Sequence, residues 1–124
     1  MPSAWYPFYL VDRVTLDSAG AGQAVLRTGA TEEFEGEEID FIVSSGTFNI
    51  TAIQDQGGKG LTNASSSDPL PSAFFLTALE QRTSQHKFAA SLMIVPDGQI
   101  SITFASGTAS ATIDVILKGR KRIL

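Results

Sequence analysis

Short segments in which apolar and polar residues alternate recur along this chain, and this alternation limits its fold more than any other feature. In residues 47–53, Phe48, Ile50 and Ala52 occupy every second position, which puts Ile53 on the opposite face. A side-chain period of two predicts a β-strand with one buried face. Further segments of strand composition lie at residues 5–16, 23–28, 37–44, 87–95, 99–105 and 109–117.

Clusters of Gly, Ser, Pro and Asp separate these segments and supply the turns between them. No alternation of strands with long helical patterns is visible, so a parallel βαβ sheet is not expected. The pattern predicts an all-β fold, a sandwich of the jelly-roll type with about seven to nine short antiparallel strands. A length of 124 residues fits one domain spanning residues 1–124.

Two segments have no clear period. Residues 54–73 have the composition of a loop, with Pro69 and Pro71, and a connection of this length in a compact domain is usually functional or mobile. Whether residues 54–73 bind a ligand stays open at this stage. Residues 74–86 are ambiguous, because their first half fits either a strand or a helical turn.

Composition excludes several classes of chemistry. The chain has no cysteine and a single histidine, which excludes disulfide frameworks, cysteine nucleophiles, thiolate zinc sites and multi-histidine metal sites. The net charge of −4 argues against nucleic-acid binding. The first basic residue, Arg13, follows the apolar N-terminal stretch, which is not the order of a secretory signal. No apolar run is long enough for a membrane span.

Motifs for catalysis or cofactor binding are incomplete. His86 lies in a polar stretch typical of a solvated loop. Ser84 and Lys87 have Ser-x-x-Lys spacing without the accompanying motifs of that enzyme class. The glycine-rich run at residues 57–60 lacks the Ser or Thr and the helix of a phosphate-binding loop. The acidic run at residues 32–40 lacks a calcium-loop pattern. We therefore expect no catalytic residue, no metal, no cofactor and no enzyme activity.

Charge is distributed unevenly between the two halves of the chain. Residues 1–62 contain nine acidic and three basic residues, a net charge of −6, whereas residues 63–124 contain four acidic and six basic residues, a net charge of +2. Four bases, at 118, 120, 121 and 122, form a C-terminal tail (residues 118–124). One interpretation is a solvated terminus. The other is that the tail meets an acidic surface, either residues 32–40 of a neighbouring copy or a larger scaffold.

The N-terminal residues 1–10 form an aromatic arm, which either packs on a core or a neighbouring subunit or offers a stacking platform for sugars. In order along the chain, these features resemble small virion proteins of tailed bacteriophages. The resemblance covers most of the chain as a pattern and contains no specific motif. It is carried by the arm, Val14-Thr15-Leu16, the segments 39–41 and 48–53, the polar residues 61–65, and the strand 113–117 followed by Lys118-Gly119-Arg120.

The resemblance implies a non-catalytic jelly-roll subunit on a phage head or tail. The leading hypothesis is therefore a virion structural protein, a capsid decoration or cement protein or a head–tail accessory subunit, assembled in the host cytoplasm. Its expected partners are the major capsid or another virion protein and further copies of itself, with no membrane and no nucleic acid. The expected partner-binding residues are those of the arm and the tail: Trp5, Tyr6, Phe8, Tyr9, Lys118, Arg120, Lys121 and Arg122.

On this hypothesis, deletion of residues 118–124 weakens binding to the particle and leaves the fold intact. The alternative hypothesis is a carbohydrate- or ligand-binding β-sandwich module, for example of a tail fibre. In that case residues 54–72 and the aromatic arm form the site, and Trp5 stacks on the sugar.

Overall fold

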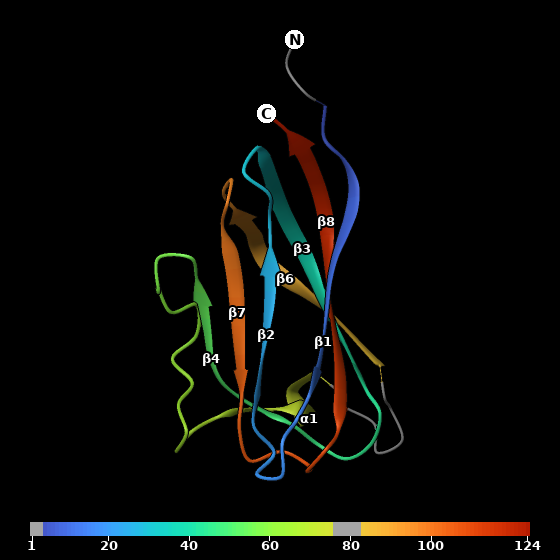
Figure 1. Ribbon diagram of the computed structural model, residues 1–124, viewed down its shortest axis with the longest axis vertical. Coiled ribbons are helices and arrows are strands. Elements are labelled where there is room, and N and C mark those ends of the chain that lie inside the picture. The colour runs from blue at the N-terminus through green and yellow to red at the C-terminus, as the bar shows by residue number, and fades with distance from the viewer. Residues whose placement is uncertain (1–3, 76–82) are drawn as a thin grey trace.

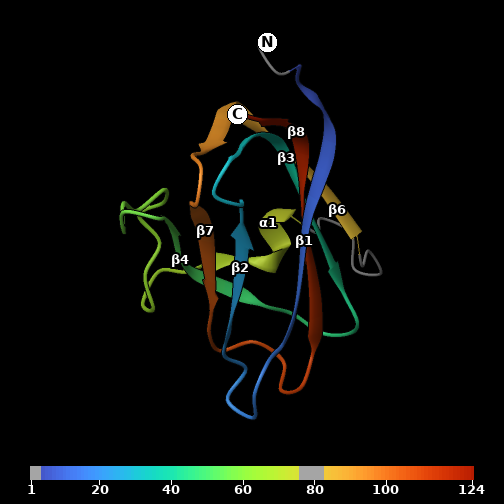
Figure 2. The same cartoon turned by 45° about the horizontal axis from the view of Figure 1, so that its top comes forward.

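The computed structural model describes residues 4–75 and 83–124, and it folds as two antiparallel β-sheets stacked face to face (Figures 1 and 2). Each sheet has four strands. The elements are β1 (Tyr6–Thr15), β2 (Gly22–Arg27), β3 (Glu32–Val43), β4 (Asn49–Asp55), β5 (Leu70–Pro71), α1 (Ser72–Phe75), β6 (Thr83–Ile94), β7 (Gln99–Phe104) and β8 (Thr112–Ile123).

The strand order is that of a jelly roll. The first sheet has the order β1-β8-β3-β6 and the second has the order β2-β7-β4-β5. The first strand thus pairs with the last, the second with the seventh, the third with the sixth and the fourth with the fifth. This is the topology of one long antiparallel hairpin rolled into two sheets. The predicted fold class is confirmed.

The core lies between the two sheets and consists of the alternate side chains of the strands. Phe48 lies at its centre, with ring centroids 5.1 Å from Phe41 and 5.5 Å from Phe104. All three rings are buried. Aromatic rings at such separations attract each other in addition to the hydrophobic gain from burial.

One part of the alternation in β4 differs from the prediction. A register shift between Ile50 and Ala52 inserts an extra residue, so Ile53 lies opposite Ile102 and packs against the core in place of Ala52. A bulge of this kind exchanges the two faces of the strand beyond it, which a strict period of two does not anticipate.

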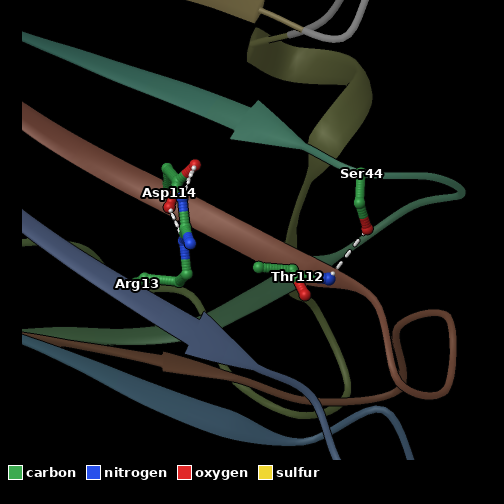
Figure 3. A network of polar contacts seen from close by, with 4 residues as sticks. All are labelled: Arg13, Ser44, Thr112 and Asp114. Atoms are coloured by element: carbon green, nitrogen blue, oxygen red, sulfur yellow. Dashed lines mark hydrogen bonds and ion pairs between the residues drawn. The ribbon is translucent and has the colours of Figure 1, made fainter.

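Polar contacts close the sandwich along one side and fix the strand ends. Asp12 in β1 accepts a hydrogen bond from the backbone N–H of Val25 in β2 at 2.7 Å, which joins the two sheets and covers an edge donor of β2. In the first sheet, Arg13 Nε donates to Asp114 at 2.6 Å, and the N–H of Thr112 donates to Ser44 Oγ at 2.9 Å (Figure 3).

Two strands are longer than the sequence indicates. Strand β3 begins at Glu32, whereas residues 29–36 are predicted to be a loop, and β8 continues to Ile123 instead of ending at Leu117. Both extensions include a glycine, Gly36 or Gly119, and the two glycines lie opposite each other in the ladder. A Cβ at position 119 would overlap the backbone of Glu35, so only glycine allows the two strands this close approach.

The register also shifts at this point. The ladder passes from the Gly36–Gly119 pair to the Glu38–Lys118 pair, which leaves Glu37 without a residue opposite it. Glu37 is therefore the extra residue of a β-bulge.

The ambiguous segments are partly resolved. Residues 72–75 form one helical turn and residues 83–86 belong to β6, while residues 76–82 lie outside the described part of the chain. His86 thus lies on a strand instead of the expected loop, as do Ser84 and, as predicted, Lys87. The positions of these three side chains lie outside the description. The predicted long connection begins after β4 and includes only the two-residue strand β5. No helix of the described residues is long and apolar enough to span a bilayer.

The predicted arm and tail are the paired ends of two strands. Tyr6 lies opposite Lys121, and Leu10 lies opposite Leu117. Residues 118–123 also pair with β3 on their other side, so they belong to an inner strand of the first sheet. The description of residues 118–124 as a tail is therefore wrong, and the structure leads us to expect that their removal affects the fold.

Deletion of residues 118–124 is predicted to lower the free energy of unfolding by about 3 kcal/mol or more, because it removes half of an inner strand together with its charged partners. Urea denaturation followed by circular dichroism measures this. Removal of Leu124 alone is the control, since it takes away one backbone hydrogen bond, to Thr31. A truncated chain as stable as the full chain would contradict the ladder described here.

Candidate functional site

The predicted partner-binding residues gather at the end of the first sheet where β1 begins and β8 ends, but their environments differ. Phe8 packs against the core, and the Lys121 Nζ lies 3.8 Å from the centre of its ring. Lys121 is only 9% exposed, which leaves it no access to a partner. Tyr9 is 61% exposed. Trp5 is half-buried against two arginines.

All four bases of the predicted tail form ion pairs with acids of β3, and we call this set the ion ladder. Most of these pairs join residues that lie opposite or diagonally across the two strands. The pairs are Arg122–Glu33 at 2.7 Å, Arg120–Glu35 at 2.8 Å, Lys121–Glu32 at 2.7 Å, Lys118–Glu38 at 3.3 Å and Lys118–Asp40 at 2.6 Å.

The ion ladder corrects an expectation from the sequence. The acidic partner of the basic tail was expected on a neighbouring copy or on a scaffold. It is instead segment 32–40 of the same chain, because β3 and β8 are neighbours in the first sheet. The charge asymmetry along the sequence therefore reflects pairing within the domain.

Lys121 is the most buried base of the ladder, and it pairs with Glu32. Glu32 also accepts a hydrogen bond from the backbone N–H of Gly29 at 2.7 Å, so it ties the β2–β3 connection to the end of β8. The hydrogen bond from Lys121, with that from Gly29, lowers the pKa of Glu32. In turn, the hydrogen bond to Glu32 raises the pKa of Lys121.

Asp40 occupies a less favourable position at the other end of the ladder. It is 3% exposed, and its Oδ1 has no hydrogen-bond partner in the structure. Burial raises the pKa of the Asp40 carboxyl, and its hydrogen bond with Lys118 opposes that shift. The hydrogen bond to Asp40 raises the pKa of Lys118. Lys118 thus forms ion pairs with two carboxylates, those of Glu38 and Asp40.

The ion ladder also positions the indole of Trp5. The guanidinium carbon of Arg120 lies 5.0 Å from the centre of a Trp5 ring, and that of Arg122 lies 4.6 Å from it. Guanidinium groups attract the negative face of an aromatic ring. Because Glu35 and Glu33 hold these two arginines, the ring rests on a fixed support.

A shallow pocket opens beside Trp5 at this end of the first sheet. It has a volume of about 270 Å³, close to the lower limit for small-molecule sites. It is lined by Trp5, which directly precedes β1, by Tyr6 and Pro7 of β1, by Glu37 in the bulge of β3, and by Gly119 and Arg120 of β8. We take this Trp5 pocket as the candidate functional site.

Glu37 is the residue of this site that the sequence interpretation missed. Five of the six acids of segment 32–40 belong to the ion ladder, and Glu37 has no ion pair with any described residue. Its position in the bulge explains this, because no base of β8 lies opposite it. The signal in the sequence was Gly36, which interrupts the alternation of Glu33 and Glu35.

The other predicted residues lie outside the pocket lining. Of the eight, Trp5, Tyr6 and Arg120 line it. Arg122 contacts it indirectly, through Trp5. The connection at residues 56–69, expected to join the aromatic arm in a ligand site, projects from the side of the sandwich away from β1 (Figures 1 and 2).

The lining offers the chemistry of binding: an aromatic face, a carboxylate acceptor and a guanidinium donor. Within the part of the chain that the structure describes, no three His, Asp or Glu side chains are grouped to hold a metal ion.

The chain was compared with protein families, curated proteins and solved structures. No family model matches the chain, and no curated protein matches it. One similar solved structure is described as "CBM4 structure and function", with 16% identity over 87% of this chain and 89% of that chain and a TM-score of 0.38. Another is the N-terminal cellulose-binding domain of Cellulomonas fimi β-1,4-glucanase C, with 12% identity over 94% of this chain and 88% of that chain and a TM-score of 0.39.

Replacement of Glu32 by Gln is predicted to remove part of the pH dependence of stability. Because the folded state lowers the pKa of Glu32 below its ordinary value of 4.5, its contribution is present above that pH and is lost as the pH falls through the lowered pKa. The wild type is therefore more stable than Glu32→Gln at pH 7, by about 1 kcal/mol, and the difference shrinks towards pH 2. Urea denaturation across this pH range tests it, and two parallel stability curves would contradict it.

Proposed function

We propose that this protein is a non-catalytic carbohydrate-binding β-sandwich whose Trp5 pocket holds a sugar ring. The observation that carries this proposal is the indole of Trp5, supported by two arginines and open to a pocket that also contains Glu37 and Arg120. A pyranose ring has an apolar C–H face and an edge of hydroxyl groups. An aromatic ring with a few polar groups around it matches both.

The rigidity of the site supports the proposal. Trp5 directly precedes β1, the other lining residues belong to three neighbouring strands, and the ion ladder ties β3 to β8. A site already ordered before binding loses little conformational entropy when the ligand arrives. The location also fits a binding module, because the pocket lies where β1 begins and β8 ends, at one end of the first sheet.

Replacement of Trp5 by Ala is predicted to weaken saccharide binding about ten-fold or more, because the stacking surface is lost. A glycan array identifies ligands for the wild type, and isothermal titration calorimetry then measures the affinity of each variant. Tyr9→Ala is the matched control, since Tyr9 is an exposed aromatic residue four positions further along the chain that does not line the pocket. Equal affinity of Trp5→Ala and wild type would refute the Trp5 pocket as the site.

We propose as a second candidate the virion subunit, a capsid decoration or accessory protein that assembles with copies of itself. The observation that favours it is at the edge of the first sheet, where Tyr9 and Val11 of β1 are both 61% exposed. An open edge strand with apolar side chains is a template for pairing with another chain. In this proposal the contact lies along β1, because the bases of the tail are engaged in the ion ladder.

Light scattering is predicted to give a defined oligomer for the wild type under this second candidate, with little change at high salt because the contact is apolar. Val11→Lys shifts the mass to that of a monomer. Thr15→Lys, another exposed position of β1, is the control and keeps the oligomer. A wild-type chain that is monomeric at all concentrations would contradict self-assembly through β1.

A further inference from the structure

The charges around the Trp5 pocket do not cancel. Arg120 Nε donates to Glu35 Oε1 at 2.9 Å, and Nη2 of the same arginine lies 2.8 Å from that oxygen. Arg122 Nε donates to Glu33 Oε1 at 2.7 Å, and its Nη2 also lies 2.7 Å from that oxygen. Both guanidinium charges are therefore balanced within the ion ladder, and the lining retains one unbalanced charge, the carboxylate of Glu37.

The bulge keeps Glu37 available for a ligand. The nearest acids of β3, Glu35 and Glu38, have bases opposite them on β8, and both carboxylates form ion pairs with these bases. Glu37 has no residue opposite it, is exposed, and lines the pocket beside Trp5. Bulges commonly re-aim a side chain next to a functional site. All acceptor positions of this carboxylate thus remain open to a bound molecule.

We propose that the pocket selects saccharides that carry a protonated amino group, such as hexosamine units with a free amine. This inference rests on the proposed carbohydrate-binding function and adds the chemical class of its ligand. The ammonium group lies at Glu37, where it donates hydrogen bonds to the carboxylate. The C–H face of the same sugar ring stacks on Trp5.

The arginines beneath Trp5 help to orient such a ligand. Two guanidinium groups close to the indole reduce the negative potential that would otherwise attract a cation to the ring. The favourable place for the ligand's ammonium group is therefore Glu37. An acidic sugar finds no available cation here, because Arg120 and Arg122 would first have to leave Glu35 and Glu33, and Glu37 repels it.

Calorimetry with four hexasaccharides tests the proposal: β-1,4-linked glucosamine, N-acetylglucosamine, glucose and a uronic acid. At pH 6 and low salt, the wild type is expected to bind the glucosamine oligomer about five-fold more tightly than the glucose oligomer, the upper range for an exposed ion pair. The N-acetylated oligomer should bind like glucose, and the uronic acid oligomer more weakly than either. Salt at 1 M should remove the preference.

Glu37→Gln is expected to reduce the preference for glucosamine over glucose to about one-fold, because the amide keeps a hydrogen-bonding group at this position and lacks the negative charge. Glu37→Ser, which lacks the carboxylate in a smaller side chain, should do the same. Asp68→Asn removes a carboxylate from the distant connection between β4 and β5 and is expected to keep the wild-type preference.

The outcomes separate this inference from the function on which it rests. If saccharides bind and binding depends on Trp5, but the amine gives no preference or Glu37→Gln keeps that preference, the inference is overturned and the proposed function stands. If the wild type binds none of the four oligomers and no glycan on the array, the proposed function is overturned together with the inference.

Discussion

Strand β8 holds the first sheet together, because it pairs along its length with β1 on one side and with β3 on the other. Its last six residues carry four basic side chains, which would repel one another if they were left unpaired. The acids of β3 remove this repulsion. The position of β1, the support of Trp5 and the anchoring of the β2–β3 connection all depend on this one strand and its ion ladder.

The glycine pair in the ladder links stability to the candidate site. Gly36 and Gly119 let β3 and β8 approach closely, and the register shift that follows leaves Glu37 as an unpaired residue. The same local feature therefore creates a close contact between strands and places a free carboxylate beside an aromatic ring. A regular ladder would have given Glu37 a partner or turned it away, and the pocket would have had no unbalanced charge.

The sequence predicted more of the fold than of the site. Alternation is a local property, so the strands around Phe48, Ile102 and Ile113 and their buried faces could be predicted without knowledge of their neighbours. The composition of residues 54–73 likewise indicated a connection. Two strand ends could not be predicted, because neither has an apolar alternation of its own. The acids before Gly36 indicated a loop, and the bases after Leu117 indicated a tail.

The sequence by itself determined that this chain forms strands, that one face of each is apolar, and that its acids and bases lie in separate segments. Only the tertiary structure decided that these two segments are partners, since pairing between β3 and β8 joins residues far apart in the chain. The same holds for Trp5 and Glu37: Trp5 precedes β1 and Glu37 belongs to β3, and these two strands lie on either side of β8. Period, composition and charge are read residue by residue, whereas register, bulges and the contents of a pocket depend on which strands become neighbours.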